Sequence, residues 1–227
     1  ESVLMLHRCV DQLEKIEQLT GICIHLDIEV EPGCRLQTSK QLSDFINKSF
    51  GDDERIRHFI RVCHDTCHAA IMQESVEECF INYDNAGLLI GKVQLSSAIE
   101  FELEKYNFKD FEHTLKMISE PKFLHQTTIQ NKNQIKFYED LPAAVKEKSL
   151  GLWRIHYHIP IHLNSFGVFN TTQKDLIHSI KQLKKRNIET WEIETYTWDI
   201  MPNTIKQHEI IDSIAKELLW AQKNIFI

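Results

Sequence analysis

Carboxylate and imidazole side chains recur at the ends of short apolar segments of this chain. The segments 22–30, 60–65, 152–159 and 190–195 all end in such residues, whereas 89–96 ends in Gln94 and two serines. The candidates are Asp27, Glu29 and Glu31 in the first segment, Asp65 and the nearby His68 at the second, His156 and His158 in the fourth, and Glu192 and Glu194 in the fifth. Carboxylates and imidazoles are ligands for zinc, manganese and iron. Because several buried charges without a cation would be costly, the pattern predicts a divalent-metal site, with zinc or manganese as the expected ion.

The spacing within these segments places like residues on one face. Side chains of an extended strand alternate between its two faces, so Asp27, Glu29 and Glu31 share a face, as do His156 and His158. Polar residues in phase along a buried strand are unusual unless they serve a site. Taken singly, each carboxylate could instead face solvent, and the two histidines could be satisfied by ordinary hydrogen bonds.

The sequence HDTCH at 64–68 allows several interpretations. Asp65 and His68 could bind a metal, or Asp65 could cap a helix by accepting backbone N–H bonds. Cys67 is more typical of a small core residue than of a ligand. Cys63 and Cys67 with His64 and His68 also resemble a zinc cluster, but a second C-x-x-C element is missing.

The elements that must position these residues alternate along the chain between helix and strand. Apolar periodicity predicts strands at 22–30, 60–65, 89–96, 152–159 and 190–195. It predicts helices at 3–19, 38–48, 74–85, 110–118, 141–147, 172–186 and 203–224, with 124–130 as an extra strand or extended loop. This alternation indicates parallel pairing of the five strands in a single α/β domain over residues 1–227.

The absence of a glycine-rich phosphate loop favours a barrel over an open doubly wound sheet. In a barrel the functional residues lie at the C-terminal ends of the strands, which is where the acidic and histidine residues occur.

Bulk properties narrow the class of partner. The chain has 227 residues, 42% of them hydrophobic, and a formal net charge of −7, which disfavours nucleic acid as a partner. Six scattered cysteines predict reduced thiols in a cytoplasmic protein. No apolar run is long enough to span a membrane, and no signal peptide is visible. Because the chain begins at Glu1 inside a predicted helix, an upstream segment is expected.

The combination of Glu29, Asp65 three residues before His68, the His-x-His of 156–158 and Glu194 resembles the metal-site pattern of the xylose-isomerase-like TIM-barrel superfamily. That superfamily includes sugar isomerases, epimerases and endonucleases of the endonuclease IV type. A narrower resemblance covers about residues 23–202. The segments HLDIEVEPGC, VCHDTCHAA, GKVQLSSAIE, IHYHIPIH, FGVFNTTQKDL and EIETYTWDIMP look like the metabolite-traffic EboE family of bacterial ebo gene clusters.

This resemblance implies that the chain supplies about strands four to eight of a (β/α)₈ barrel, with the first three strands absent. It implies metal ligands on the fourth strand (Glu29), the fifth (Asp65 and His68), the seventh (His156 and His158) and the eighth (Glu194). Two positions depart from the superfamily pattern. Gln94 stands where a histidine is common, and His156 stands where endonuclease-type members have aspartate. One or two metal ions are therefore expected rather than a trinuclear zinc cluster.

The leading hypothesis is a metal-dependent isomerase, epimerase or lyase acting on a small polyhydroxylated metabolite. Glu29 and Glu194 would hold the metal and serve as base, and His68 would orient a ligand or shuttle protons. Three alternatives remain open: a non-catalytic metabolite-binding or traffic protein, an endonuclease IV-like phosphodiester hydrolase, and a metal-free barrel kept for protein contacts. Five barrel strands cannot close alone, so association with an N-terminal segment or a homodimer is also expected.

Overall fold

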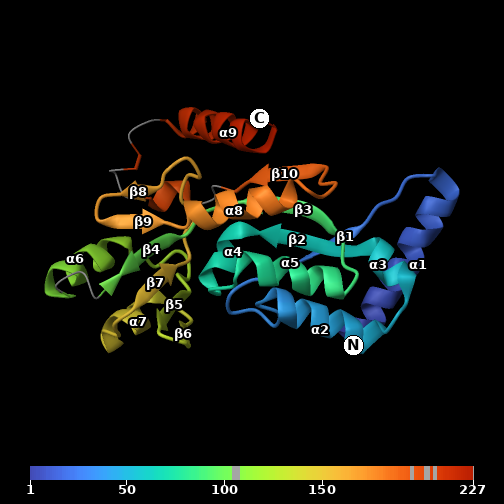
Figure 1. Cartoon of the computed structure of the whole chain (residues 1–227), viewed down its shortest axis with the longest axis horizontal. Coiled ribbons are helices and arrows are strands. Elements are labelled where there is room, and N and C mark those ends of the chain that lie inside the picture. Colours follow the sequence, from blue (N-terminus) through green and yellow to red (C-terminus); the bar gives the residue numbers. More distant parts are fainter. Residues whose placement is uncertain (104–107, 195–196, 202–204, 207–208, 227) are drawn as a thin grey trace.

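A computed structural model describes residues 1–103, 108–194, 197–201, 205–206 and 209–226, and it shows a mixed α/β fold with two sheets (Figure 1). The first sheet has four strands in the order β1-β2-β3-β10, and each neighbouring pair is parallel. These strands are β1 (Leu26–Glu29), β2 (Ile60–Asp65), β3 (Ile90–Leu95) and β10 (Thr190–Ile193). Parallel pairing is therefore confirmed for four of the five predicted strands, while a closed barrel is not shown.

Helices connect and cover the parallel strands. They are α1 (Ser2–Thr20), α2 (Ser39–Phe50), α3 (Glu54–Phe59), α4 (Thr66–Ile71), α5 (Val76–Asn85), α8 (Gln173–Leu183) and α9 (Ile210–Phe226). Side-chain caps fix four of the starts, because Thr38, Asp53, Asp65 and Ser75 each accept a backbone N–H in the first turn of the helix that follows. Apolar side chains of all these helices except α4 pack against one face of the sheet in one buried core, whereas Cys67 and Ile71 of α4 form a small separate cluster with Ala98.

The two faces of the parallel sheet differ in polarity. Val62 and Leu95 belong to the buried apolar core beneath the helices. Because side chains alternate along a strand, Glu29, Asp65 and Glu192 project from the opposite face. The predicted two-residue periodicity thus separates the apolar face from the face that bears the carboxylates.

The second sheet is antiparallel and has the order β6-β5-β7-β4-β9-β8. Its strands are β4 (Ile99–Glu102), β5 (Thr127–Asn131), β6 (Gln134–Tyr138), β7 (Leu152–Ile155), β8 (Ser165–Phe166) and β9 (Phe169–Thr171). Helices α6 (Phe108–Ile118) and α7 (Leu141–Glu147) lie on the same side of the molecule as this sheet (Figure 1). A separate aromatic core stabilises it, in which the rings of Phe101 and Trp153 stack with centroids 5.3 Å apart.

The predicted parallel strand 152–159 is wrong in both its pairing and its end. Strand β7 stops at Ile155 and pairs antiparallel with β4 and β5. Residues 96–98 lead the chain out of the parallel sheet into β4, which pairs with β7 and β9 rather than with β3, so β7 joins a second sheet. Residues 156–159 leave the sheet, and the Ile159 N–H donates to the Ser97 carbonyl.

Several smaller boundaries also differ from the predictions. Residues 22–25 precede β1 rather than belonging to it, and the short helices α3 and α4 were not predicted. Residue 195 of the predicted last strand, and residues 203–204 and 207–208 of the predicted last helix, lie outside the described residues. Among the helices that the structure describes, none combines the length and apolarity needed to cross a membrane.

Candidate metal site

The six predicted metal-binding residues lie together where the C-terminal ends of the parallel strands meet the segment that follows β7. Two groups of three have ligand atoms that all lie within 4.8 Å of one another: Asp65, His68 and His158, and Glu29, Asp65 and Glu194. A third group within the same limit joins His156 and His158 to Cys67. The shared members Asp65 and His158 make one connected cluster of all seven residues.

Asp65 is held in place by the start of α4. Its Oδ1 accepts hydrogen bonds from the His68 N–H and from Ser96 Oγ, each at 2.8 Å. Its Oδ2 is buried without a hydrogen-bond partner among the described residues. Burial raises the pKa of Asp65, but the nearby His68 and His158 rings and these hydrogen bonds outweigh burial and lower the pKa to about 2. Asp65 is therefore a buried carboxylate with one oxygen already fixed.

His68 lies in the first turn of α4 and is buried. Its Nδ1 is 3.1 Å from the Val30 carbonyl oxygen and 3.1 Å from Glu29 Oε1. Burial alone lowers the pKa of His68, yet the charges of Asp65 and Glu29 raise it to about 9. Because both neighbours of Nδ1 are acceptors, Nδ1 is the donor, and Nε2 is the nitrogen that can serve as a ligand when the ring is neutral.

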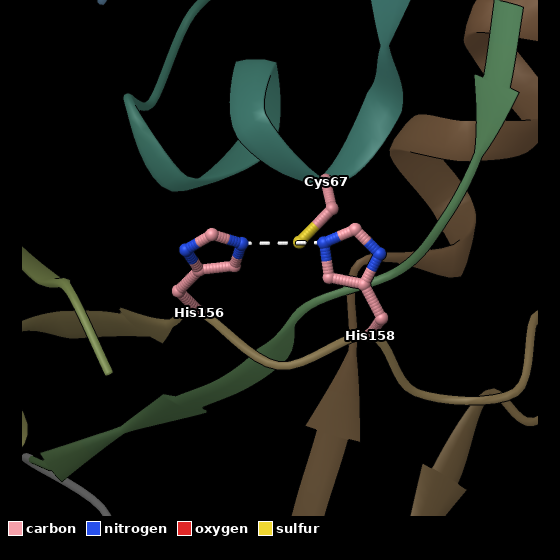
Figure 2. A group of neighbouring side chains, drawn as sticks. All are labelled: Cys67, His156 and His158. Atoms are coloured by element: carbon pink, nitrogen blue, oxygen red, sulfur yellow. Dashed lines mark hydrogen bonds between the residues drawn. The ribbon is translucent and has the colours of Figure 1, made fainter. Parts of the chain in front are cut away.

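His156 and His158 face each other from the extended segment that follows β7. His156 Nδ1 lies 2.8 Å from Gln126 Oε1, and His158 Nδ1 lies 3.2 Å from the Glu194 carbonyl oxygen. The two Nε2 atoms lie 3.2 Å apart, which is a hydrogen bond when one of them carries a proton (Figure 2). In neutral rings with both Nδ1 atoms as donors, the two Nε2 atoms instead present lone pairs to each other. Burial is the main cause that lowers the pKa of both rings, well below the ordinary value for His156. Two neutral imidazoles with converging lone pairs suit a cation.

The site is partly accessible to solvent at Glu194 and Glu29. Their side chains are 30% and 32% exposed. Glu194 Oε2 is nevertheless buried without a hydrogen-bond partner among the described residues, and its closest ion-pair contact is His158 Nδ1 at 3.8 Å. Burial, together with the charges of Asp65 and Glu29, raises the pKa of Glu194 to about 7.

The donor set fits a divalent cation. Three carboxylates and three imidazoles converge, two carboxylate oxygens are buried without partners within the described part of the chain, and the Nδ1 atom of each imidazole lies beside a protein oxygen. Metal-bound histidines usually donate their other N–H to a carbonyl or carboxylate in this way, which fixes the ring and its tautomer.

The alternative zinc cluster of Cys63, His64, Cys67 and His68 does not form. His64 is on the helix-covered face, where its ring packs 5.0 Å from that of Phe80. The Cys63 thiol donates to Gln94 Oε1 at 2.9 Å. Gln94, the departure from the superfamily pattern, is thus engaged with a neighbouring strand.

Sequence reasoning missed the residues that orient the predicted ligands. Gln126 and Ser96 fix His156 and Asp65, and Cys67 lies beside the two histidines of the 156–158 segment. The position of Cys67 directly before His68 was a signal for its proximity to the site, whereas no local pattern identifies Gln126.

No protein-family model, curated protein or solved structure matches the chain in sequence or structure comparisons.

Proposed function

We propose that this chain is a metal-dependent protein of the sugar isomerase and epimerase type that acts on a small polar metabolite. The main support is the pair of buried, unpartnered oxygens, Asp65 Oδ2 and Glu194 Oε2, within a described group that also includes Glu29. Leaving such carboxylates buried without compensation is unfavourable, and a divalent cation would satisfy them. Two of the three carboxylates lie where a polar substrate can reach them, because Glu29 and Glu194 are partly exposed, whereas Asp65 is buried beneath them.

The residues that would hold the ion are Glu29, Asp65, His68, His156, His158 and Glu194. This mixture of oxygen and nitrogen donors suits zinc or manganese. When bound, the cation supplies Lewis-acid polarisation of substrate oxygens.

The chain's own side chains could supply the proton transfer that isomerisation requires. Glu194 is partly exposed, and the oxygen of its carboxylate that does not bind the ion could accept a proton from a substrate C–H or O–H group. His68 would hold the ion through Nε2 while its Nδ1–H faces the Val30 carbonyl and Glu29, so its role there would be to orient the centre. Glu29 lies on the other side of Asp65 from Glu194 in the strand order, and it positions His68 through the contact at Nδ1.

We also propose that the four parallel strands belong to a (β/α)₈ barrel. Strands β1 and β10 are separated by two strands, which in a flat sheet would place them about 14 Å apart. Two extended glutamate side chains can bridge most of that distance, and Glu29 at the end of β1 and Glu194 just after β10 have ligand atoms within 4.8 Å of each other. The support for a barrel is therefore the set of four neighbouring parallel strands with helical connections and with the candidate ligands near their C-terminal ends.

The proposed substrate is a small metabolite of the kind that the resemblance to the metabolite-traffic family implies. A net charge of −7 favours this class over nucleic acid. All six cysteines are free thiols, and we propose a cytoplasmic location on that basis.

Hydrogen–deuterium exchange tests the proposal directly. The protein, loaded with zinc or manganese, is incubated in D₂O with a panel of aldoses, ketoses, polyols and their phosphates, and the products are followed by NMR. The expected result is metal-dependent deuterium incorporation or a new isomer with at least one compound. The Glu194→Gln variant should lose this activity, while Glu192→Gln should keep it, because Glu192 forms a half-exposed ion pair with Lys92.

A metal-loaded protein that binds compounds of the panel without exchange or product would contradict catalysis and support a metabolite-binding role instead. A protein that neither binds metal nor turns over any compound would contradict the proposed function altogether.

A further inference from the structure

Cys67 is buried beside the two histidines that follow β7. Its side chain is fully buried in the first turn of α4, and its N–H donates to Ser96 Oγ at 2.9 Å. Its Sγ contacts the carbonyl oxygen of Tyr157 at 3.4 Å, and Tyr157 is the residue between His156 and His158 in the chain. Figure 2 shows the sulfur projecting from α4 toward the space between the two imidazole rings.

The three side chains offer one sulfur and two nitrogen atoms at close range. A ligand atom from each of Cys67, His156 and His158 lies within 4.8 Å of the other two. All three residues are buried, with exposed fractions of 4% or less. Cysteine and histidine together are a donor set typical of zinc, and thiolate ligands select softer ions than carboxylates do.

We infer that Cys67, His156 and His158 form a thiolate–imidazole subsite for a soft divalent ion such as zinc, distinct from the carboxylate subsite of Glu29, Asp65 and Glu194. This inference rests on the proposed function, because both subsites belong to the metal centre proposed above. It assigns the ligands of that centre to two separate ions. On binding, the Cys67 S–H bond breaks, an Sγ–metal bond forms, and the proton leaves to solvent. No oxidation or reduction takes place.

The competing explanation is that Cys67 only fills space. Its sulfur does belong to a small buried cluster with Ile71 and Ala98. Apolar packing accounts for the burial of the thiol but not for two oriented imidazoles beside it, whose Nδ1 atoms are fixed by Gln126 and Glu194 and whose Nε2 atoms lie 3.2 Å apart. A thiolate-bound cation accounts for both.

Cobalt(II) binding distinguishes these explanations, because Co²⁺ can replace zinc and its absorption spectrum depends on the atoms that bind it. The full chain is stripped with a chelator and titrated with Co²⁺ while absorption is recorded. We expect visible d–d bands together with a near-ultraviolet thiolate-to-cobalt charge-transfer band. Cys67→Ala should lose the charge-transfer band and about one equivalent of bound metal, while retaining metal at the carboxylate subsite. Cys79→Ala, which removes an equally buried thiol from α5, should match the wild type.

X-ray absorption of the zinc-loaded wild type gives a second measurement that needs no variant. The expected result is sulfur scattering at about 2.3 Å from zinc. Metal bands with no charge-transfer band, or zinc with only nitrogen and oxygen neighbours, would overturn the inference and leave the proposed function intact. The absence of any bound metal would contradict both.

Discussion

Asp65 Oδ1 accepts a hydrogen bond from the backbone N–H of His68 at 2.8 Å, so one bond fixes the N-cap residue of α4 and the residue three positions later. Capping and metal binding were alternative interpretations of this pair, and the geometry is compatible with both at once. Oδ1 caps the helix, and Oδ2 is buried without a hydrogen-bond partner among the described residues, which leaves it available to a cation. The short helix thereby positions the His68 imidazole on the same centre as the Asp65 carboxylate.

Asp65→Asn separates the two roles. Asparagine caps helices as well as aspartate does, so α4 should remain folded and the melting temperature should change little. The negative charge on Oδ2 is lost, and metal affinity should fall by at least about 100-fold, since second-shell changes alone cost about 10–100-fold. Calorimetric titration with zinc and with manganese measures the affinity. Wild-type affinity in the variant would show that Asp65 is a cap only.

Gln126→Ala tests the orientation of His156. Removal of the amide leaves His156 Nδ1 without its 2.8 Å acceptor, so the ring is less well fixed and zinc affinity should fall by about 10–100-fold. Gln130→Ala, a substitution within β5 four residues after Gln126, should bind zinc as the wild type does. Equal affinities for the two variants would argue against a supporting role for Gln126.

Local sequence was sufficient to predict the parallel strands and the residues at their ends. Apolar runs in β1, β2, β3 and β10 alternate with helical patterns, and Glu29, Asp65 and Glu194 fall near the ends of those runs. Because the C-terminal ends of parallel strands share one edge, their proximity followed from topology alone.

The antiparallel sheet could not be predicted in the same way. A short apolar strand such as β7 looks the same whichever direction its partner runs, and its partners β4 and β5 are distant in sequence. His156 and His158 still share a side, because residues in any extended segment alternate. The approach of Cys67 and Gln126 depends on tertiary packing between α4, β5 and the segment after β7, which no local spacing encodes.

Glu217 should make stability depend on pH. It is fully buried in α9, its Oε2 accepts the Ile161 N–H at 3.0 Å, and burial raises its pKa from 4.5 to about 7. The folded state therefore binds more protons than the unfolded state in this window, and stability falls as pH rises from about 4.5 to 7. The loss should be on the order of 2–3 kcal/mol.

Urea unfolding of the wild type and of Glu217→Gln across this pH range measures how much of the pH dependence of the free energy of unfolding comes from Glu217. Because glutamine does not titrate, the variant should lack this loss of stability and should become more stable relative to the wild type as pH rises. Parallel stability curves for the two proteins would contradict the assignment.

Arg154 joins β7 to α4 and to two carboxylates. Its guanidinium donates to Glu100 Oε2 at 2.9 Å, to the Ala70 carbonyl at 2.8 Å and to Asp175 Oδ2 at 2.5 Å. Arg154→Met leaves the buried Glu100 charge poorly compensated and should cost about 3–5 kcal/mol in the free energy of unfolding. Lys174→Ala removes a largely exposed partner of Glu100 and should cost less than about 1 kcal/mol. If chemical denaturation gave similar losses in the free energy of unfolding for the two variants, the buried hydrogen bonds of Arg154 would not be the stabilising feature.

The metal content of the purified protein tests the central claim most directly. Elemental analysis should find at least about one equivalent of zinc or manganese in the wild type, because the cluster offers at least three converging donors in each group. His158→Ala should lose most of it, since His158 belongs to two of the groups, whereas His178→Ala should not, because His178 pairs with Glu77 at the surface. A wild-type protein without metal after incubation with zinc and manganese, or a His158→Ala variant with full metal content, would contradict the account.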